Sequence, residues 1–215
     1  MATVNSLGER LGCVYSLVPR GSRFLDIGTD HGLLPVRLIC DGIVAGAAAA
    51  DINEKPLCSA RRTAMRAGVD MAFFLADGFD GVDYDYNVAA ICGMGGHLIV
   101  DILSRASVQP GTRLIIQPMR DAPLVRAYLW DNGFTIELER YVVESNRPYL
   151  VLSCVKTGER TLHDATDEYL GLSDDMSCGR REYELKLLRS LRKRRRDDSG
   201  VVSRVIRVLE ERYGV

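Results

Sequence analysis

The sequence predicts an α/β fold, with a mostly parallel sheet followed by a helical hairpin at the C-terminus. Over residues 1–160, short apolar runs alternate with segments of helical periodicity, which is the pattern of repeated strand–helix units. After residue 160, an acidic stretch is followed by a strongly basic one. We therefore expect two parts: an α/β domain over residues 1–160 and, over residues 161–215, an acidic linker with a basic helical hairpin.

The elements of the expected domain follow one another in short succession. The parallel strands are expected at Arg23–Ile27, Gly46–Asp51, Ala72–Leu75, Asn87–Cys92 and Arg113–Gln117, with Pro118 breaking the last. The helices are expected at Leu33–Cys40, Glu54–Ala67, His97–Ala106 and Pro123–Asn132. Because alanine favours helix, the second strand rests on its position between two helices. Two final runs, Phe134–Val143 and Tyr149–Val155, predict an antiparallel pair joined around residues 145–148.

The composition excludes several classes of protein. The chain has 215 residues, 47% of them hydrophobic, and its 28 basic residues nearly balance 29 acidic ones, so neither a disordered chain nor a uniformly basic nucleic-acid binder is indicated. The six cysteines form no C-x-x-C pair, and none of the three histidines has two cysteines close to it in the sequence. We therefore expect reduced thiols, a cytoplasmic protein and no metal site. No run approaches the ~20 apolar residues of a membrane span, and residues 1–10 lack the apolar core of a signal peptide.

The strongest local signal is the turn after the first expected strand, Gly28–Gly32. Glycine lets the backbone turn tightly and approach a ligand, and the N-terminus of the next helix offers free N–H groups. Asp30 stands where a dinucleotide-binding loop has its second glycine, and its charge repels a pyrophosphate but tolerates a sulfonium or an ammonium group. The turn therefore favours S-adenosylmethionine over a nicotinamide cofactor. The alternative is a tight turn in which the aspartate caps the helix.

Three aspartates fall at the ends of neighbouring expected strands: Asp26, Asp51 and Asp77. Open α/β sheets bind ligands at the carboxyl ends of their strands, so this coincidence is more informative than any one residue. Asp51 is placed to accept the ribose hydroxyls of a nucleoside, unless it is a solvated loop residue. Asp77 is placed to accept from an adenine amino group or to brace a backbone amide. The segment Gly93–Gly96 allows close approach either of a ligand or of a packed helix.

The C-terminal segment combines positive charge with helical periodicity. Residues 180–196 hold nine basic and two acidic residues. Apolar residues at helical spacing form one face before a break at residues 197–200 and a second face after it: Tyr183, Leu187, Leu188 and Leu191, then Val201, Val202, Val205, Ile206 and Leu209. We expect an antiparallel helical pair that contacts nucleic-acid phosphates, the alternative being a solvated helical face. The candidate contacts are Arg180, Arg181, Arg189, Arg192 and Lys193.

Together these features resemble the bacterial tRNA (adenine-22 N1)-methyltransferase family. The resemblance runs from about Leu7 to Gly158 and rests on motifs at the strand ends. They are Leu25–Gly32 with Leu34 and Pro35, Ala76–Phe79, Ile91–Ile99, Ile116–Pro118, and Glu144 with Tyr149. The resemblance implies a class I methyltransferase of Rossmann-like fold, with a C-terminal coiled coil, that uses S-adenosylmethionine to methylate N1 of an adenine in tRNA.

The resemblance also implies roles for the candidate residues. Those implied for the cofactor are Asp26, Gly28, Asp30, His31, Gly32, Asp51, Ile52, Asp77 and Gly78, with Gly93, Met94 and Gly95 at the mouth of the pocket. Those implied for the substrate are Gln117, Pro118 and Met119, together with the basic C-terminal residues. The family usually has glutamate at the position of Asp51. Asp30 is the candidate catalytic residue, because a carboxylate stabilises the positive charge that N1 methylation leaves on adenine.

One position departs from the family pattern. The family has asparagine after Gln-Pro, where this chain has Met119, and a thioether cannot hold a base by hydrogen bonds as an amide does. Two alternatives therefore stay open: a tRNA-binding homologue with impaired catalysis, and a methyltransferase that acts on another nucleic-acid substrate. A nicotinamide oxidoreductase is a third, opposed by Asp30 and by the lack of G-x-G-x-x-G. The sequence indicates no obligate protein partner and no state beyond a monomer.

Overall fold

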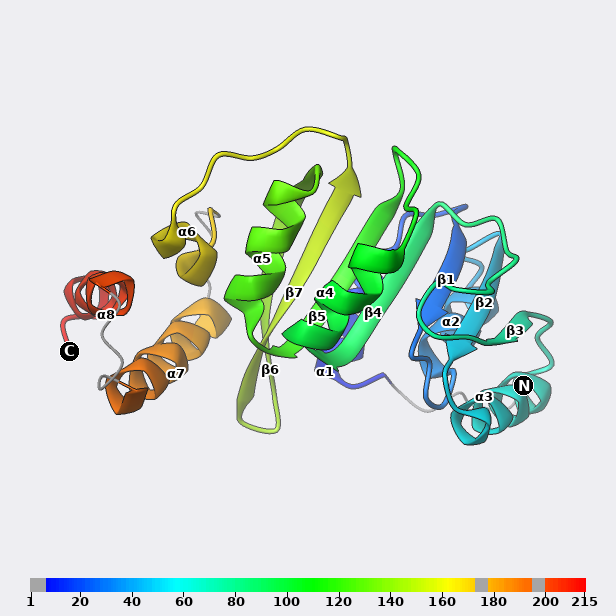
Figure 1. The fold of residues 1–215 in the computed structure, drawn as a ribbon. Coiled ribbons are helices and arrows are strands. Elements are labelled where there is room, and N and C mark those ends of the chain that lie inside the picture. Colours follow the sequence, from blue (N-terminus) through cyan, green and yellow to red (C-terminus); the bar gives the residue numbers. More distant parts are fainter. Residues whose placement is uncertain (1–6, 173–177, 195–199) are drawn as a thin grey trace.

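A single seven-stranded sheet forms the centre of the computed structural model, which describes residues 7–172, 178–194 and 200–215 (Figure 1). The strand order is β3-β2-β1-β4-β5-β7-β6. The strands are β1 (Arg23–Ile27), β2 (Gly46–Asp51), β3 (Ala72–Leu75), β4 (Val88–Gly95), β5 (Arg113–Arg120), β6 (Phe134–Glu144) and β7 (Arg147–Lys156). The first five run parallel, and β7 is antiparallel to both of its neighbours, β5 and β6, which confirms the expected α/β architecture.

Helices cover both faces of this sheet. They are α1 (Glu9–Ser16), α2 (Leu33–Cys40), α3 (Glu54–Ala67), α4 (Gly96–Arg105), α5 (Ala122–Asp131), α6 (Ala165–Leu170), α7 (Cys178–Arg194) and α8 (Gly200–Tyr213). The α4 and α5 helices bury their apolar residues against one face, in front in Figure 1, and α1 and α2 pack on the other. No helix in the described part of the chain is long and apolar enough to cross a membrane.

The alanine-rich β2 strand shows how the fold overrides local propensity. Residues 47–50 are all alanine and at most 3% exposed. They pair with β1 on one side and β3 on the other, so the strand is interior to the sheet and covered on both faces. Alanine favours helix in isolation, but tertiary pairing decides here.

The strands β4 to β7 all run further than the sequence predicts. The expectation that Pro118 breaks β5 is wrong, because β5 continues to Arg120. Pairing between β5 and β7 stops at Ile116, so the missing N–H of Pro118 removes no bond from that ladder. The β4 strand likewise continues through the glycine segment to Gly95, with irregular register against β5. The β6–β7 turn is tighter than expected, with only Ser145 and Asn146 between the strands, both at positive φ.

Two helices, α1 and α6, are not predicted from the sequence. The α1 helix has eight residues and buries only Val14, so its apolar pattern is weak. The six-residue α6 begins with a capping box in which Asp164 and Asp167 bond each other's backbone N–H groups. The expected acidic linker therefore contains a helix. Two acidic residues of the expected linker, Asp174 and Asp175, lie outside the described residues. The same holds for residues 197–199 of the expected break between the C-terminal helices.

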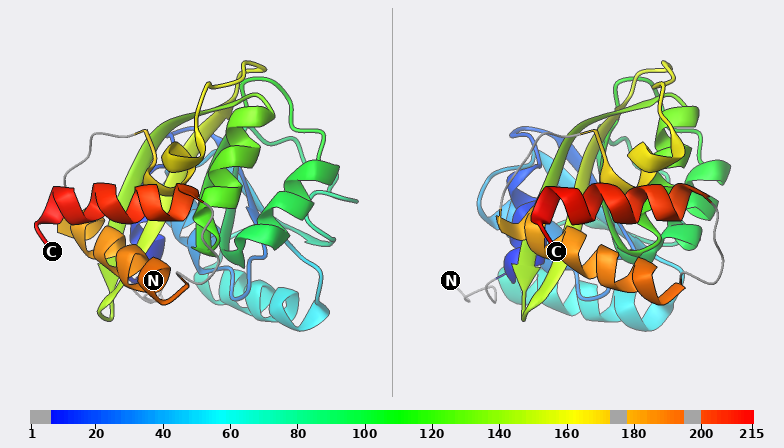
Figure 2. Two further views of the ribbon diagram at one scale, coloured as in Figure 1. Left: turned by 60° about the vertical axis from the view of Figure 1, so that its left-hand side comes forward. Right: turned by 90° about the vertical axis from the view of Figure 1, so that its left-hand side faces the viewer.

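One of the two C-terminal helices packs on the sheet, and the two pack on each other. The α7 helix lies against β6 and β7, and α8 lies against α6 and α7. Their apolar residues form a cluster of their own, which includes Leu188, Leu191 and Leu209. The two helices cross at an open angle (Figures 1 and 2). The expected pair of helices is thus present, but the described residues do not show the extended side-by-side packing of a coiled coil.

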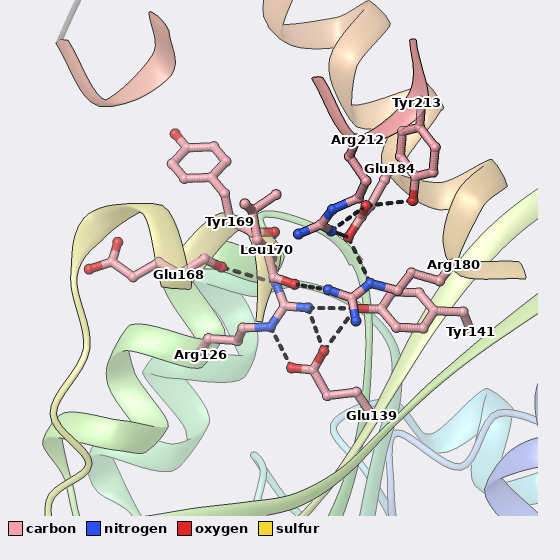
Figure 3. Close-up of polar contacts among 10 residues, drawn as sticks. All are labelled: Arg126, Glu139, Tyr141, Glu168, Tyr169, Leu170, Arg180, Glu184, Arg212 and Tyr213. Atoms are coloured by element: carbon pink, nitrogen blue, oxygen red, sulfur yellow. Dashed lines mark hydrogen bonds and ion pairs between the residues drawn. The ribbon is translucent and has the colours of Figure 1, made fainter. Parts of the chain in front are cut away.

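A buried ionic network joins these helices to the sheet (Figure 3). Arg126 on α5 is fully buried and donates two hydrogen bonds to Glu139 on β6, at 2.7 and 3.1 Å. Its third nitrogen donates to the backbone carbonyls of Glu168 and Tyr169, at 3.0 and 3.1 Å. Because each buried charge meets an opposite charge or a carbonyl, the network fixes α6 against α5 and β6.

The same network continues into α7 and α8. Arg180 donates to Glu184 at 2.8 Å and to the carbonyl of Leu170 at 3.0 Å. Glu184 also accepts from Arg212 at 2.8 Å and from the Tyr213 hydroxyl at 2.7 Å. The two C-terminal helices are therefore held to the α/β domain by paired charges as well as by apolar contact.

Replacing Arg126 by methionine should lower the free energy of unfolding by about 3–5 kcal/mol, because Glu139 would stay buried without its cation. Urea unfolding measures this loss. The matched control is Asp85→Asn, which removes the exposed Arg23–Asp85 pair and should cost about 0–1 kcal/mol. An equal, small loss in both variants would show that the network does not stabilise the fold.

Candidate active site

A crevice opens at the carboxyl ends of the central strands. From β1 the chain crosses to β2 on one side of it, and the neighbour of β1 on the other side is β4. The strand order therefore reverses direction at β1. Ligands of open α/β sheets bind at such switch points. The cavity there has a volume of about 490 Å³. Most of the residues predicted for the cofactor line it, namely Asp26, Gly28, Asp30, His31, Asp51, Ile52, Asp77, Gly78, Gly93 and Met94.

The turn after β1 forms one wall of the cavity. Gly28, Asp30 and Gly32 all have positive φ, at 73°, 51° and 66°. The N–H groups of Gly28 and Thr29 donate to the carbonyl of Ala50 at 2.8 and 3.2 Å, which ties the turn to β2. Asp30 is therefore a non-glycine residue in the left-handed region, and its side chain is 73% exposed beside the cavity.

Gly32 has a packing role that the sequence analysis did not predict. It does not line the cavity, and it caps the N-terminus of α2. A Cβ at this position would lie 2.9 Å from the Cβ of Ala60 and 3.1 Å from its Cα. The glycine thus lets α3 pack directly against the turn. Gly95 is likewise outside the cavity lining, beside the Arg120 guanidinium.

Asp26 is a buried carboxyl at the end of β1. It is 6% exposed, and the Thr29 hydroxyl donates to it at 2.8 Å. Burial raises the pKa of Asp26 to about 6, and the nearby charge of Asp51 adds to the rise. The site therefore holds a carboxylate that a cationic ligand would stabilise.

The other two predicted acids are held in different ways. Asp51 accepts from the backbone N–H of Asn53 at 2.9 Å through Oδ1, and Oδ2 has no hydrogen-bond partner among the described residues. Asp77 accepts from Arg105 at 3.2 Å. Arg105 also binds Asp80 and Asp101, and its hydrogen bonds with Asp77 and Asp101 raise its pKa. Asp51 thus keeps a free acceptor at the cavity, whereas Asp77 is braced.

The prediction that Gln117 and Pro118 contact the substrate is not supported by their positions. Both are buried and neither lines the cavity. Instead, Oε1 of Gln117 accepts from the N–H of Gly93 at 3.1 Å and from Nη1 of Arg10 at 2.8 Å. Gln117 therefore braces the glycine segment from behind. Met119 does line the cavity and is 47% exposed.

Several residues line the cavity without having been predicted from the sequence. Arg10 comes from α1, and its guanidinium also lies 5.8 Å from the centre of the Tyr149 ring. Nothing in the local sequence marks Arg10, because a long-range contact with Gln117 places it. Leu98 on α4 lines the cavity and is 48% exposed. Thr29 lies within the predicted turn, and its partner Asp26 is three residues before it.

The basic residues of the C-terminal helices separate into two groups. The prediction that Arg180 contacts phosphates is wrong for this structure, because Arg180 is 2% exposed and bonded within the ionic network. Arg192 is exposed but pairs with Glu210 at 2.7 Å. Three others remain exposed candidates: Arg181, Arg189 and Lys193.

The mostly parallel sheet, with an acid-lined crevice at its switch point, defines a Rossmann-like domain of the class I methyltransferase type. Residues 7–152 match the family model described as "Methyltransferase domain". The chain is also 31% identical over 179 residues to the tRNA (adenine(22)-N(1))-methyltransferase of Bacillus subtilis, covering 80% of this chain and 73% of that protein. The chain belongs to the tRNA (adenine-22 N1)-methyltransferase family.

Solved structures agree with this assignment. Streptococcus pneumoniae Sp1610, a candidate tRNA (m1A22) methyltransferase crystallised with S-adenosyl-L-methionine, has a TM-score of 0.82 and 29% identity, covering 94% of this chain and 97% of that chain. The B. subtilis m1A22 tRNA methyltransferase TrmK, at 24% identity, shares the fold with a TM-score of 0.80, covering 97% of this chain and 96% of that one.

Gly32→Ala should destabilise the protein by about 1–3 kcal/mol, because the new methyl group meets Ala60 and the backbone has positive φ. Thermal or urea unfolding provides the measurement. Gly12→Ala is the control, since Gly12 lies in α1 with nothing within 4 Å of an added Cβ. That change should leave stability unchanged or raise it by up to ~1 kcal/mol. Similar values for the two variants would contradict the packing role of Gly32.

Proposed function

We propose that this chain is an S-adenosylmethionine-dependent methyltransferase that methylates N1 of adenine-22 in tRNA. The observation that carries the proposal is the convergence of three carboxyl groups, Asp26, Asp51 and Asp77, on one crevice in a chain of this family. The relative in Bacillus subtilis is named for this reaction, and the structure of Sp1610 contains S-adenosyl-L-methionine.

The chemistry of the crevice fits this cofactor. A buried carboxyl at Asp26 and an exposed one at Asp30 favour a ligand that carries a sulfonium and an ammonium group. The free Oδ2 of Asp51 is an acceptor for ribose hydroxyls. Asp77 and Gly78 would meet the adenine, beside the exposed apolar side chain of Ile52. We assign His31, Gly93 and Met94 to the rest of the lining.

The reaction needs orientation more than base catalysis. The bound cofactor supplies a methyl group attached to a positively charged sulfur. Adenine N1 already has a lone pair, so it forms a bond to the methyl carbon as the carbon–sulfur bond breaks, and no proton need be removed. The chain would hold an extruded adenine in line, with Met119 and Leu98 as an apolar wall that excludes water. The positive charge then moves to the adenine, where Asp30 would stabilise it.

We assign the two parts of the chain to two tasks. Residues 1–160 would form the catalytic domain. Residues 161–215 would contact the tRNA backbone through Arg181, Arg189 and Lys193, a contact that weakens with salt. We further propose that the protein acts in the cytoplasm as a monomer, without an obligate protein partner.

Incubation of the chain with S-adenosylmethionine and unmodified tRNA should produce N1-methyladenosine, detected by mass spectrometry of the nucleosides. A transcript with adenine-22 replaced by guanine should stay unmethylated. No methyl transfer, with cofactor and tRNA both bound, would overturn the enzyme assignment and favour a catalytically impaired homologue. Methylation of the substituted transcript to the same extent would overturn the assignment of the position.

Affinity for S-adenosylhomocysteine should fall about tenfold between pH 7 and pH 5. Asp26 has a pKa of about 6 in the free protein, and the cationic ammonium group of the ligand favours its charged form. Protonation below pH 6 therefore removes an attraction, and affinity rises again as pH increases. Calorimetry across this range measures the change.

In Asp26→Asn, binding should be weaker at neutral pH and nearly independent of pH over this range. A variant that keeps the full pH dependence would show that another group is responsible.

A further inference from the structure

The solvent-facing side of α3 carries a stripe of positive charge. Lys55, Arg62 and Arg66, here called the α3 stripe, fall within a narrow sector at 100° per residue. The buried residues of the helix are on the opposite side: Leu57, Ala60 and Ala64. All three stripe residues are exposed, and the stripe spans about 16 Å along the helix at 1.5 Å per residue.

The charges of the α3 stripe are not neutralised within the chain. Across the described residues, no carboxylate lies within 4.0 Å of any of the three cationic groups. On the C-terminal helices, Arg192 pairs with Glu210 and Arg212 with Glu184, whereas Arg181, Arg189 and Lys193 have no ion pair among the described residues. An unpaired cation gives up no ion pair when it binds an anion, so the α3 stripe is as well prepared for a polyanion as the exposed basic residues of α7.

The α3 stripe lies next to the crevice. The helix begins directly after Asn53, which lines the cavity. Ser59 lies near the stripe on α3, and its Oγ is 2.8 Å from Nδ1 of His31, another residue that lines the cavity. In Figures 1 and 2, α3 runs along the end of the sheet where the parallel strands terminate. A strand of nucleic acid whose base enters the crevice can thus continue over α3.

The position of α3 in the sheet adds a second argument. It packs on β2 and β3, at one edge of the sheet, whereas α7 packs on β6 and β7 at the other edge, with α8 against it. The crevice lies at the carboxyl ends of the central strands, between these two edges of the sheet. A substrate held only by the C-terminal helices would be gripped from one side of the target base, and contacts on both sides fix its position more strongly.

We propose that the α3 stripe is a second tRNA-binding surface, which holds backbone phosphates beside the target nucleotide. This inference rests on the proposed function, since it takes tRNA as the substrate. Contacts of Lys and Arg with phosphates are independent of base sequence, so the α3 stripe contributes affinity and position rather than sequence selection.

The test reverses two charges that lie away from the first turn of the helix and do not line the cavity. In Arg62→Glu/Arg66→Glu, the dissociation constant for tRNA should rise at least ~10-fold at about 0.1 M salt, and the slope of log affinity against log salt should fall by about two. Affinity for S-adenosylhomocysteine should stay within about twofold of wild type, which shows that the variant is folded and its crevice intact.

Arg20→Glu/Arg160→Glu is the matched control, with the same change in net charge. Both residues are exposed, and they lie in the loops before β1 and after β7, at the opposite end of the sheet. The control should bind tRNA within about twofold of wild type. Equal tRNA affinities in the two double variants would overturn the α3 surface while leaving the proposed function intact. A wild-type chain that neither binds nor methylates tRNA would overturn both.

Discussion

The site depends on one backbone constraint, the five-residue turn between β1 and α2. The chain must leave a buried strand, reverse over the sheet edge and start a helix within Gly28–Gly32, and it does so with three residues at positive φ. Two amides of the turn are tied to Ala50 on β2, and Gly32 packs on Ala60 of α3. These contacts hold the Asp26 and Asp30 carboxyls beside Asp51 at one cavity. Without this turn, the carboxyl groups of Asp26, Asp30 and Asp51 would not face one cavity.

A second layer of organisation fixes what surrounds the crevice. Gln117 holds both Gly93 and Arg10, so the far wall is braced by a buried amide and not by a side chain in the cavity. The Arg126–Glu139 pair anchors α6 to β6, and Arg180 on α7 bonds to the carbonyl of Leu170 in α6. The crevice therefore lies between two fixed flanks, which suits a substrate much larger than the cavity.

Much of this organisation could be predicted from the sequence, because period-2 and period-3.6 patterns report burial directly. The positions of Asp26, Asp51 and Asp77 at the cavity are predictable, because the end of a strand is marked by its local sequence. The role of Gln117 is not, because it depends on Arg10, which lies 107 residues away. The burial of Arg180 was also missed. A run of basic residues looks solvated from sequence alone, and only the approach of Leu170 and the position of Glu184 show that one member is buried.

A crystal structure of the chain with S-adenosylhomocysteine tests the central claim most directly. We expect ligand density in the cavity at the carboxyl ends of β1 and β4, with the ribose hydroxyls bonded to Asp51 and the amino group of the amino acid on the side of Asp26 and the β1–α2 turn. Density at another surface, or a ribose that does not contact Asp51, would contradict it.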